Sequence, residues 1–296
     1  MERKTFLKII LGSTMLSTLS CFKRMGENLP EQDLVMPVLF VGHGSPMNAI
    51  EDNEFSRRWR EMAQSIPTPK AVLIVSAHWL TRGTRVTAME APKTIHDFGG
   101  FPEALFKAQY PAPGSPLMAQ ETVNTIQSTK VELDHDWGLD HGAWSVVKQM
   151  YPNADIPMLQ LSIDYNRPPQ YHYDLARELA SLRKKGVLIL GSGNMVHNLG
   201  MMRLPGGNFD NINQEYGFDW TLEINELLKK KITDQDHQAV INYQSLHKDM
   251  RLAVPTPDHY YPLLYTLGLQ GKNEGVSFFN DKAIAGSLTM TSVKIG

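Results

Sequence analysis

Cysteine is almost absent from this sequence of 296 residues, which contains only Cys21. A single cysteine excludes an internal disulfide framework, a cysteine-based zinc finger and a CxxC redox site. Any metal ion bound within one chain must therefore be held by histidine or carboxylate side chains.

The sequence also has no marked excess of positive or negative residues. The chain has 29 Lys and Arg against 31 Asp and Glu, for a formal charge of −2. This balance predicts no basic surface for nucleic acid. With 42% hydrophobic and 20% charged residues, the composition is that of a folded chain, and the length fits one large domain or two small ones.

Long hydrophobic runs are also missing. Near the N-terminus, three basic residues precede a weakly apolar run, Ile9–Leu19, that is followed by Cys21. The run is too short and too rich in Ser and Thr for a permanent membrane span, which needs about 20 apolar residues. We predict that residues 1–30 are an export leader, with Cys21 resembling a lipid acceptor, and slightly favour a periplasmic or lipid-anchored protein. A loosely ordered extension of a cytoplasmic protein is the alternative.

Short apolar runs alternate with longer helical patterns from Leu34 onward. The predicted strands are Val35–Val41, Ala71–Ser76, Thr84–Ala88, Ile156–Ile163 and Val187–Leu190. The predicted helices are Glu54–Ser65, Pro116–Ile126, Ala143–Tyr151, Tyr171–Lys184, Gln214–Lys230 and Asp258–Leu267. Several strands are apolar throughout, as in strands covered on both faces by helices. Residues 34–296 are therefore predicted to form a single α/β domain, layered α/β/α around a largely parallel or mixed central sheet.

Histidine is abundant, and three of the ten histidines follow the ends of apolar strands. VLFVGHG contains His43, VLIVSAH ends at His78, and VLILGSGNMVH ends at His197. In open α/β sheets the carboxyl ends of the strands form the ligand crevice, so three imidazoles delivered there can converge on one point. Because imidazole suits Fe, Zn, Cu and Ni, the pattern predicts a histidine-rich metal site.

Other histidines are assigned from their neighbours in the sequence. His259, in PTPDHYYP, lies at the start of a helical pattern, and His141 lies in WGLDHGAW; both are further candidates for the site. His96, in TIHDFGGFP, belongs either to a substrate-facing loop or to a capped surface turn. The remaining four are expected to face solvent: His135, His172, His237 and His247.

Residues that support a histidine site are less distinctive. Polar candidates for orienting the imidazoles are Ser45, Asp97, Asn194 and Asn198. Such residues also cap helices and turns, which is their commoner use. Candidates for an apolar wall beside an aromatic ligand are Phe98, Phe101, Trp79 and Trp144, and packing in the core is the alternative for each.

Several long motifs together point to one protein family. GHGSPMNAIEDN, TIHDFGGFP, WGLDHGAWSVVKQMYP, GSGNMVHNL and PTPDHYYPLLYTLG together resemble the 4,5-DOPA extradiol dioxygenase family, within the LigB-type class III extradiol ring-cleavage dioxygenases. The resemblance extends from about Val35 to Gly296. It implies a non-haem Fe(II) enzyme, often found with zinc, that inserts both atoms of O2 into a catechol. The expected partners are therefore a catechol and O2, in a monomer or small homo-oligomer.

The resemblance implies metal-binding roles for four histidines and an acid/base role for His141. The metal-binding candidates are His43, His78, His197 and His259. Three protein ligands on an octahedral ion leave two positions for a catecholate and one for O2, whereas four leave too few. We expect His43, His78 and His259 to bind the metal during turnover. His197 is expected to be a fourth ligand only in a substrate-free zinc form, and a base or hydrogen-bond donor in turnover.

Two other functions remain open from the sequence. A zinc ion on three histidines could support a hydrolase or lyase, although no HExxH motif supplies a general base. A non-catalytic metal-binding module of the same fold is the second alternative. Retention of all five candidate histidines favours the dioxygenase.

Overall fold

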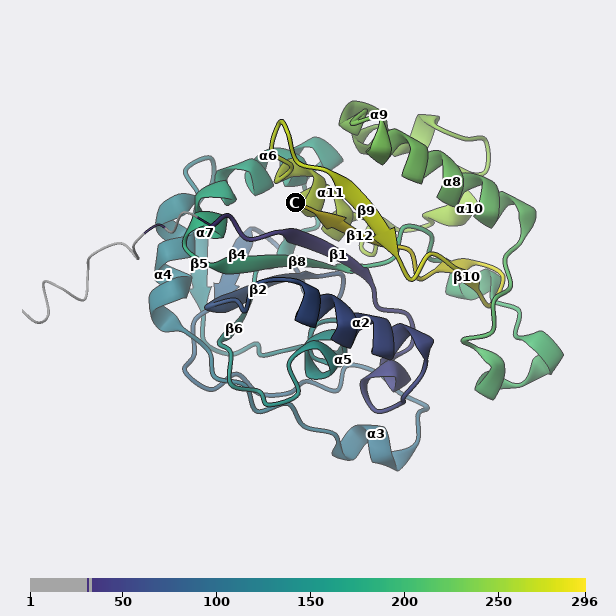
Figure 1. Cartoon of the computed structure of the whole chain (residues 1–296), viewed down its shortest axis with the longest axis horizontal. Helices are drawn as coiled ribbons and strands as arrows, with labels where there is room; N and C mark the ends of the chain where they lie inside the picture. Colours follow the sequence, from purple (N-terminus) through teal and green to yellow (C-terminus); the bar gives the residue numbers. More distant parts are fainter. Residues whose placement is uncertain (1–30, 32–33) are drawn as a thin grey trace, which may run out of the picture. The chain divides into compact units, whose positions relative to one another are not determined.

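Six strands form the central sheet of this computed structural model, which describes Glu31 and residues 34–296. In spatial order they are β6 (Met158–Gln160), β2 (Ala71–Ser76), β8 (Val187–Gly193), β1 (Val38–Gly42), β12 (Ser292–Ile295) and β9 (Val276–Phe279). The first four run parallel, whereas β12 is antiparallel to both β1 and β9. The sheet is therefore mixed, and the chain has the predicted layered α/β fold (Figure 1).

Helices cover both faces of the sheet (Figure 1). On one face α2 (Glu54–Ser65) packs against α5 (His141–Met150), and on the other α11 (Tyr261–Gly268) packs against α6 (Pro169–Glu178). Strand residues contact the two faces alternately, as the strand period of two requires. Both layers bury apolar side chains, which explains why β2 and β8 read as continuous apolar runs.

The other elements lie around this framework. The short strands are β3 (Leu80–Thr81), β4 (Thr84–Thr87), β5 (Val131–Asp134), β7 (Ile163–Asp164), β10 (Ala283–Ile284) and β11 (Leu288–Thr289). The remaining α-helices are α3 (Glu103–Lys107), α4 (Pro116–Thr125), α7 (Ala180–Lys184), α8 (Asp219–Thr233), α9 (His237–Ile241) and α10 (Met250–Ala253). Short 3-10 turns, which include η1 (Pro46–Ala49), connect several of them.

The element boundaries differ from the prediction where local signals were weak. Helix α2 has the predicted bounds because the Asn53 side chain accepts hydrogen bonds from two backbone N–H groups at its start and Ser56 completes a capping box. The predicted helix 171–184 is instead two helices, α6 and α7. Strands β9 and β12 were not predicted, because their short sequences contain polar residues and take strand form through tertiary pairing, β12 with β1 and β9 with β12.

Part of the prediction lies outside the described residues, namely the export leader at residues 1–30 with Cys21. Within Glu31 and residues 34–296, no helix is both long enough and apolar enough to cross a membrane.

One histidine prediction is wrong. His172 was expected to face solvent, but it lies on the face of α6 that packs against α11 and is completely buried. Its Nδ1 lies 3.1 Å from the Tyr265 hydroxyl, and its ring stacks on Tyr261 at a centroid distance of 4.2 Å. His172 shares the helix face of Leu175 and Ala176, which the helical period turns inward despite polar neighbours in the sequence. His135 is exposed, and His237 and His247 are partly buried.

Burial of His172 makes the stability of the fold depend on pH. Desolvation lowers the pKa of His172 to about 4, against about 6.5 in an unfolded chain. Between these values the unfolded state binds more protons, so stability falls as pH drops from 6.5 towards 4. We expect urea unfolding to show that wild type loses about 2 kcal/mol more than His172→Gln between pH 7 and pH 5. The control His135→Gln, at an exposed site, should keep the wild-type pH slope, and an equal slope in His172→Gln would contradict the assignment.

Candidate active site

Three neighbouring strands end at the same level of the sheet. Ser76 of β2 pairs with Ser192 of β8, and Gly42 of β1 pairs with Gly193. His43 follows β1 directly, and its backbone N–H donates to the Gly193 carbonyl at 3.1 Å. The carboxyl ends of β1, β2 and β8 therefore open onto one crevice, where ligands bind in open α/β sheets.

His259 reaches the same crevice from the start of α11. A Cβ on Gly193 would lie 2.2 Å from the His259 carbonyl oxygen, so only glycine allows this approach. The Asn194 backbone N–H also donates to that carbonyl, at 2.9 Å. Close packing on β8 thus fixes a histidine that lies more than 60 residues further along the sequence.

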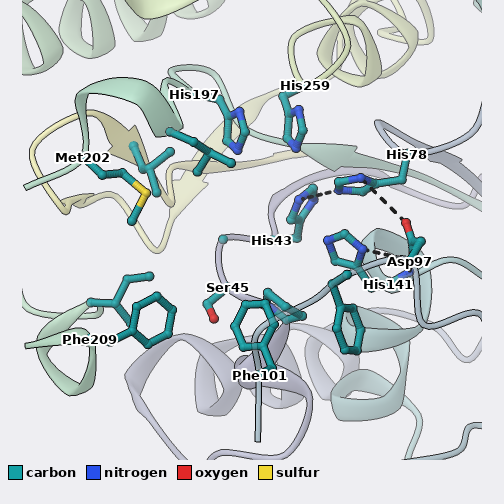
Figure 2. A pocket seen from close by; sticks show the side chains of 16 residues that line it. His43, Ser45, His78, Asp97, Phe101, His141, His197, Met202, Phe209 and His259 are labelled. Carbon is teal, nitrogen blue, oxygen red and sulfur yellow. Dashed lines mark hydrogen bonds and ion pairs between the residues drawn. The ribbon is translucent and has the colours of Figure 1, made fainter. Parts of the chain in front are cut away.

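Three of the predicted metal-binding histidines form a cluster that we call the histidine trio: His43, His78 and His259. One ring nitrogen from each lies within 4.8 Å of the others, and their rings face a common space (Figure 2). The Nε2 atoms of His43 and His78 are 3.2 Å apart. The ring centroids of the three pairs are 4.9 to 5.2 Å apart.

Hydrogen bonds determine which nitrogen of His43 is free. Ser192 Oγ lies 2.5 Å from the Gly142 carbonyl, to which it must donate its only proton. It therefore accepts a hydrogen bond from the Nδ1–H group of His43, 3.0 Å away. The Nε2 atom of His43, which faces His78, is left with a lone pair.

The carboxylate of Asp258 acts in the same way on His259. Burial raises the pKa of Asp258 and is the largest single effect, but the hydrogen bond and charge of His259, together with a hydrogen bond from the Thr256 side chain, hold the pKa well below the usual range. The ionised carboxylate accepts from His259 Nδ1, which leaves Nε2 as the free nitrogen. Neither Ser192 nor Asp258 was predicted, although Asp258 directly precedes His259 in the PTPDH motif.

The site favours neutral imidazoles. Burial, followed by the charges of neighbouring histidines, keeps the pKa of His43 and of His78 well below the ordinary value. Burial also lowers the pKa of His197 to about 3. Neutral rings with free Nε2 atoms so close together suit a divalent metal ion, since a cation would occupy the space towards which the lone pairs point. The residues therefore fit a three-histidine metal site.

His141, at the first position of α5, lies beside the trio. Its ring centroid is 3.9 Å from that of His78. Asp97 Oδ1 lies 3.0 Å from His141 Nδ1 and accepts a hydrogen bond from the His141 backbone N–H at 2.8 Å. Burial would raise the pKa of Asp97, but the interaction with His141 lowers it overall. An ionised Asp97 favours the proton on His141 Nδ1 and leaves Nε2 able to accept one.

A buried hydrogen-bond network holds the start of α5 in place. Asp140 caps the helix by accepting from the Ala143 backbone N–H at 3.0 Å. The same carboxylate accepts from Ser76 Oγ and Gln160 Nε2, each at 2.6 Å. Burial raises the pKa of Asp140. These contacts join α5 to the ends of β2 and β6, and so fix His141 relative to the strand that leads to His78.

His197 lies next to the trio but outside it. Its ring stacks on His259 with a centroid distance of 3.5 Å and an interplanar angle of 4°. Within the described residues, its ring nitrogens do not belong to either cluster of potential ligands, which are the trio and the group His78, Asp97 and His141. His197 therefore lies where it can contact a molecule bound at the trio.

A cavity of about 410 Å³ opens in front of the histidines. Figure 2 shows His43, His78, His141, His197 and His259 on one side, and Phe101, Met202 and Phe209 on the other. Among the predicted wall residues, Phe98 and Phe101 line the cavity. Trp144 is buried in the core, and Trp79 stacks on Trp137.

The other supporting candidates have structural roles in the described chain. Ser45 lines the cavity and caps η1, where its side chain accepts from the Met47 backbone N–H. The side-chain amides of Asn194 and Asn198 donate to the carbonyls of Thr289 and Leu252. His96 Nε2 lies 2.8 Å from the Ala108 carbonyl, and the residue does not line the cavity. Of the four polar candidates, Asp97 contacts the site histidines.

Comparison with known proteins agrees with this geometry. The profile of the catalytic LigB subunit of aromatic ring-opening dioxygenase matches residues 37–291. A protein of Escherichia coli K12 named 4,5-DOPA dioxygenase extradiol is 47% identical over 88% of this chain and 95% of its own length. A Beta vulgaris protein of the same name is 34% identical over 89% and 97%.

A solved structure supports the fold directly. The crystal structure of an uncharacterized Escherichia coli K12 protein matches with a TM-score of 0.76 and 42% identity, covering 88% of this chain and all of that one. The residues matched by the profile include the four parallel strands, both helical layers and the histidine trio. The chain therefore belongs to the LigB family of extradiol, aromatic ring-opening dioxygenases.

Proposed function

We propose that residues 34–296 form a catalytic domain that cleaves a DOPA-type catechol with both atoms of O2. The observation that carries this proposal is the histidine trio, in which the Nε2 atoms of His43 and His78 lie 3.2 Å apart, beside His141 in an aromatic-walled cavity. DOPA is the proposed substrate because the similar proteins of Escherichia coli and Beta vulgaris are named 4,5-DOPA dioxygenase extradiol.

The proposed metal ligands are the Nε2 atoms of His43, His78 and His259, with His197 as a fourth ligand only in a substrate-free zinc form. Fe(II) is the proposed ion for turnover, and Zn²⁺ is the proposed ion of the substrate-free form because it competes well for imidazole sites. When bound, Fe(II) would supply the positive charge that acidifies the catechol hydroxyls and the redox capacity to activate O2. Three neutral ligands leave that charge undiminished.

The other residues have proposed roles in proton transfer and binding. His141 accepts a catechol proton at Nε2, and the Asp97 carboxylate at Nδ1 stabilises the resulting imidazolium. His197 is the second base or hydrogen-bond donor, since it lies at the cavity edge of the trio. Phe98 and Phe101 exclude water and hold the aromatic ring.

A zinc hydrolase would use the same trio but would need a general base for water. Among the described residues that line the cavity, Asp97 is the only carboxylate, and it is engaged with His141. Family membership also disfavours a hydrolase or a non-catalytic module.

Oxygen uptake tests the proposed reaction. Protein loaded anaerobically with Fe(II) and mixed with L-DOPA should consume O2 when air is admitted and form a yellow ring-opened product. The zinc-loaded protein is the control and should consume none, because Zn²⁺ has no redox chemistry. Failure of both iron and manganese with a panel of catechols would overturn the proposal.

Single substitutions separate the trio from His197. His43→Ala should abolish stoichiometric iron binding and turnover together, because it removes a ligand. His197→Ala should retain one iron per chain and lose about 10²–10⁴ in kcat, the usual contribution of a general acid or base. Metal analysis and oxygen uptake measure both effects. Iron loss in His197→Ala but not in His259→Ala would reverse the assignment.

Ser192 provides a test of the hydrogen bond that orients His43. Ser192→Ala should weaken zinc affinity about 10–100-fold, the range found for partners of metal-bound histidines. Ser145→Ala is the matched control, since Ser145 is equally buried and its Oγ has no hydrogen-bond partner among the described residues. Competition with a chelator measures affinity without turnover. Equal losses in both variants would show a general packing effect instead.

A further inference from the structure

The walls of the cavity around the proposed catechol site carry no positive side chain other than histidine. Its sixteen lining residues, all within the described chain, include neither Lys nor Arg. Their only carboxylate is Asp97, whose Oδ1 lies 3.0 Å from His141 Nδ1. Away from the histidines the lining is apolar: Phe98, Phe101, Leu199, Met202, Phe209, Ile212 and Leu288. A substituent with a free carboxylate therefore finds no cationic partner here.

A second recess of about 240 Å³ lies next to this cavity. The two share the side chains of Phe101, Phe209 and Ile212. The ring centroids of Phe101 and Phe209 are 5.9 Å apart, and Figure 2 shows both rings on the side of the cavity opposite the histidines. A group that projects from a bound catechol past the Phe101 and Phe209 rings would reach this recess.

The recess presents hydrogen-bond acceptors. Glu51, Asp210 and Asn213 line it, again without Lys or Arg. In the described part of the chain, neither carboxylate forms an ion pair; Glu51 accepts from Asn53 and Asp210 from Asn208. Asn213 Oδ1 is buried and has no hydrogen-bond partner there. Two carboxylates without a cationic partner favour a ligand that is a cation and donates N–H groups.

We propose that this recess selects the catechol substituent by charge, accepting an ammonium group and discriminating against a carboxylate that is not accompanied by an amine. Glu51, Asp210 and Asn213 are the specificity-determining residues. The inference rests on the proposed catechol cleavage and refines it: DOPA is recognised through its ammonium group, and amines without the carboxylate are substrates too.

A charge series on the wild-type protein tests the inference. The substrates are dopamine, neutral 4-methylcatechol and 3,4-dihydroxyphenylpropionate, compared by oxygen uptake with Fe(II). We expect kcat/KM to be at least tenfold higher for dopamine than for the anionic catechol, mainly through KM. The ratio should shrink at high salt because the recess is partly open to solvent. A ratio near one, or one favouring the anion, overturns the inference.

Asn213→Arg provides the converse test by placing a cation in the recess. It should lower the ratio of kcat/KM for dopamine to kcat/KM for 3,4-dihydroxyphenylpropionate at least fivefold. The control is Asn273→Arg, which adds the same charge at an exposed site that lines neither the cavity nor the recess and should leave this ratio unchanged. If Asn213→Arg does not fold, Glu51→Gln should move the ratio in the same direction. Equal ratios in the recess and control variants overturn the assignment.

Binding separates this inference from the proposed reaction. Calorimetry of the three catechols with the zinc-loaded protein measures the charge preference without turnover. Preferential binding of dopamine with no oxygen uptake by the iron form would contradict the reaction and support the recess. Cleavage of 4-methylcatechol without any charge preference would support the proposed reaction and contradict the role of the recess.

Discussion

The common level at which β1, β2 and β8 end is the constraint on which the site depends. Parallel pairing sets Ser76 opposite Ser192 and Gly42 opposite Gly193. The loops that carry the histidines therefore start from neighbouring points. A shift of β8 by one residue would turn its side chains to the other face of the sheet. It would also move Gly193 away from the backbone carbonyl of His259, which approaches so closely that a Cβ would clash.

Burial has two opposite consequences for the histidines. It removes water from the rings and so favours their neutral forms, which are the forms that bind metal ions. It also requires a partner for each ring N–H, because an unpaired buried donor is costly. Ser192 and Asp258 satisfy that requirement for His43 and His259. In satisfying it they leave the Nε2 atoms free, so the same contacts stabilise the fold and prepare the site.

The strand-end histidines were predictable because they follow apolar runs whose strand character is local. The layered α/β fold followed from the same alternation of runs. The inward position of His172 was missed, since polar neighbours hid the helix face it shares with Leu175. The roles of Ser192 and Asp258 could not be predicted either, because a serine or aspartate before a turn usually caps it. Only their distances to an imidazole distinguish them.

The sequence by itself determined the kinds of ligand and the family resemblance, because one cysteine excludes thiolate sites and long motifs are read directly from the chain. The tertiary structure alone decided which histidine ring nitrogens lie close enough together to bind one metal ion. It brings together His43, His78 and His259, which are separated by up to 216 positions, and places His197 in a stack beside them. The physical reason is that sheet register and the contact between β8 and α11 involve backbone atoms far apart in sequence. No local pattern records those contacts.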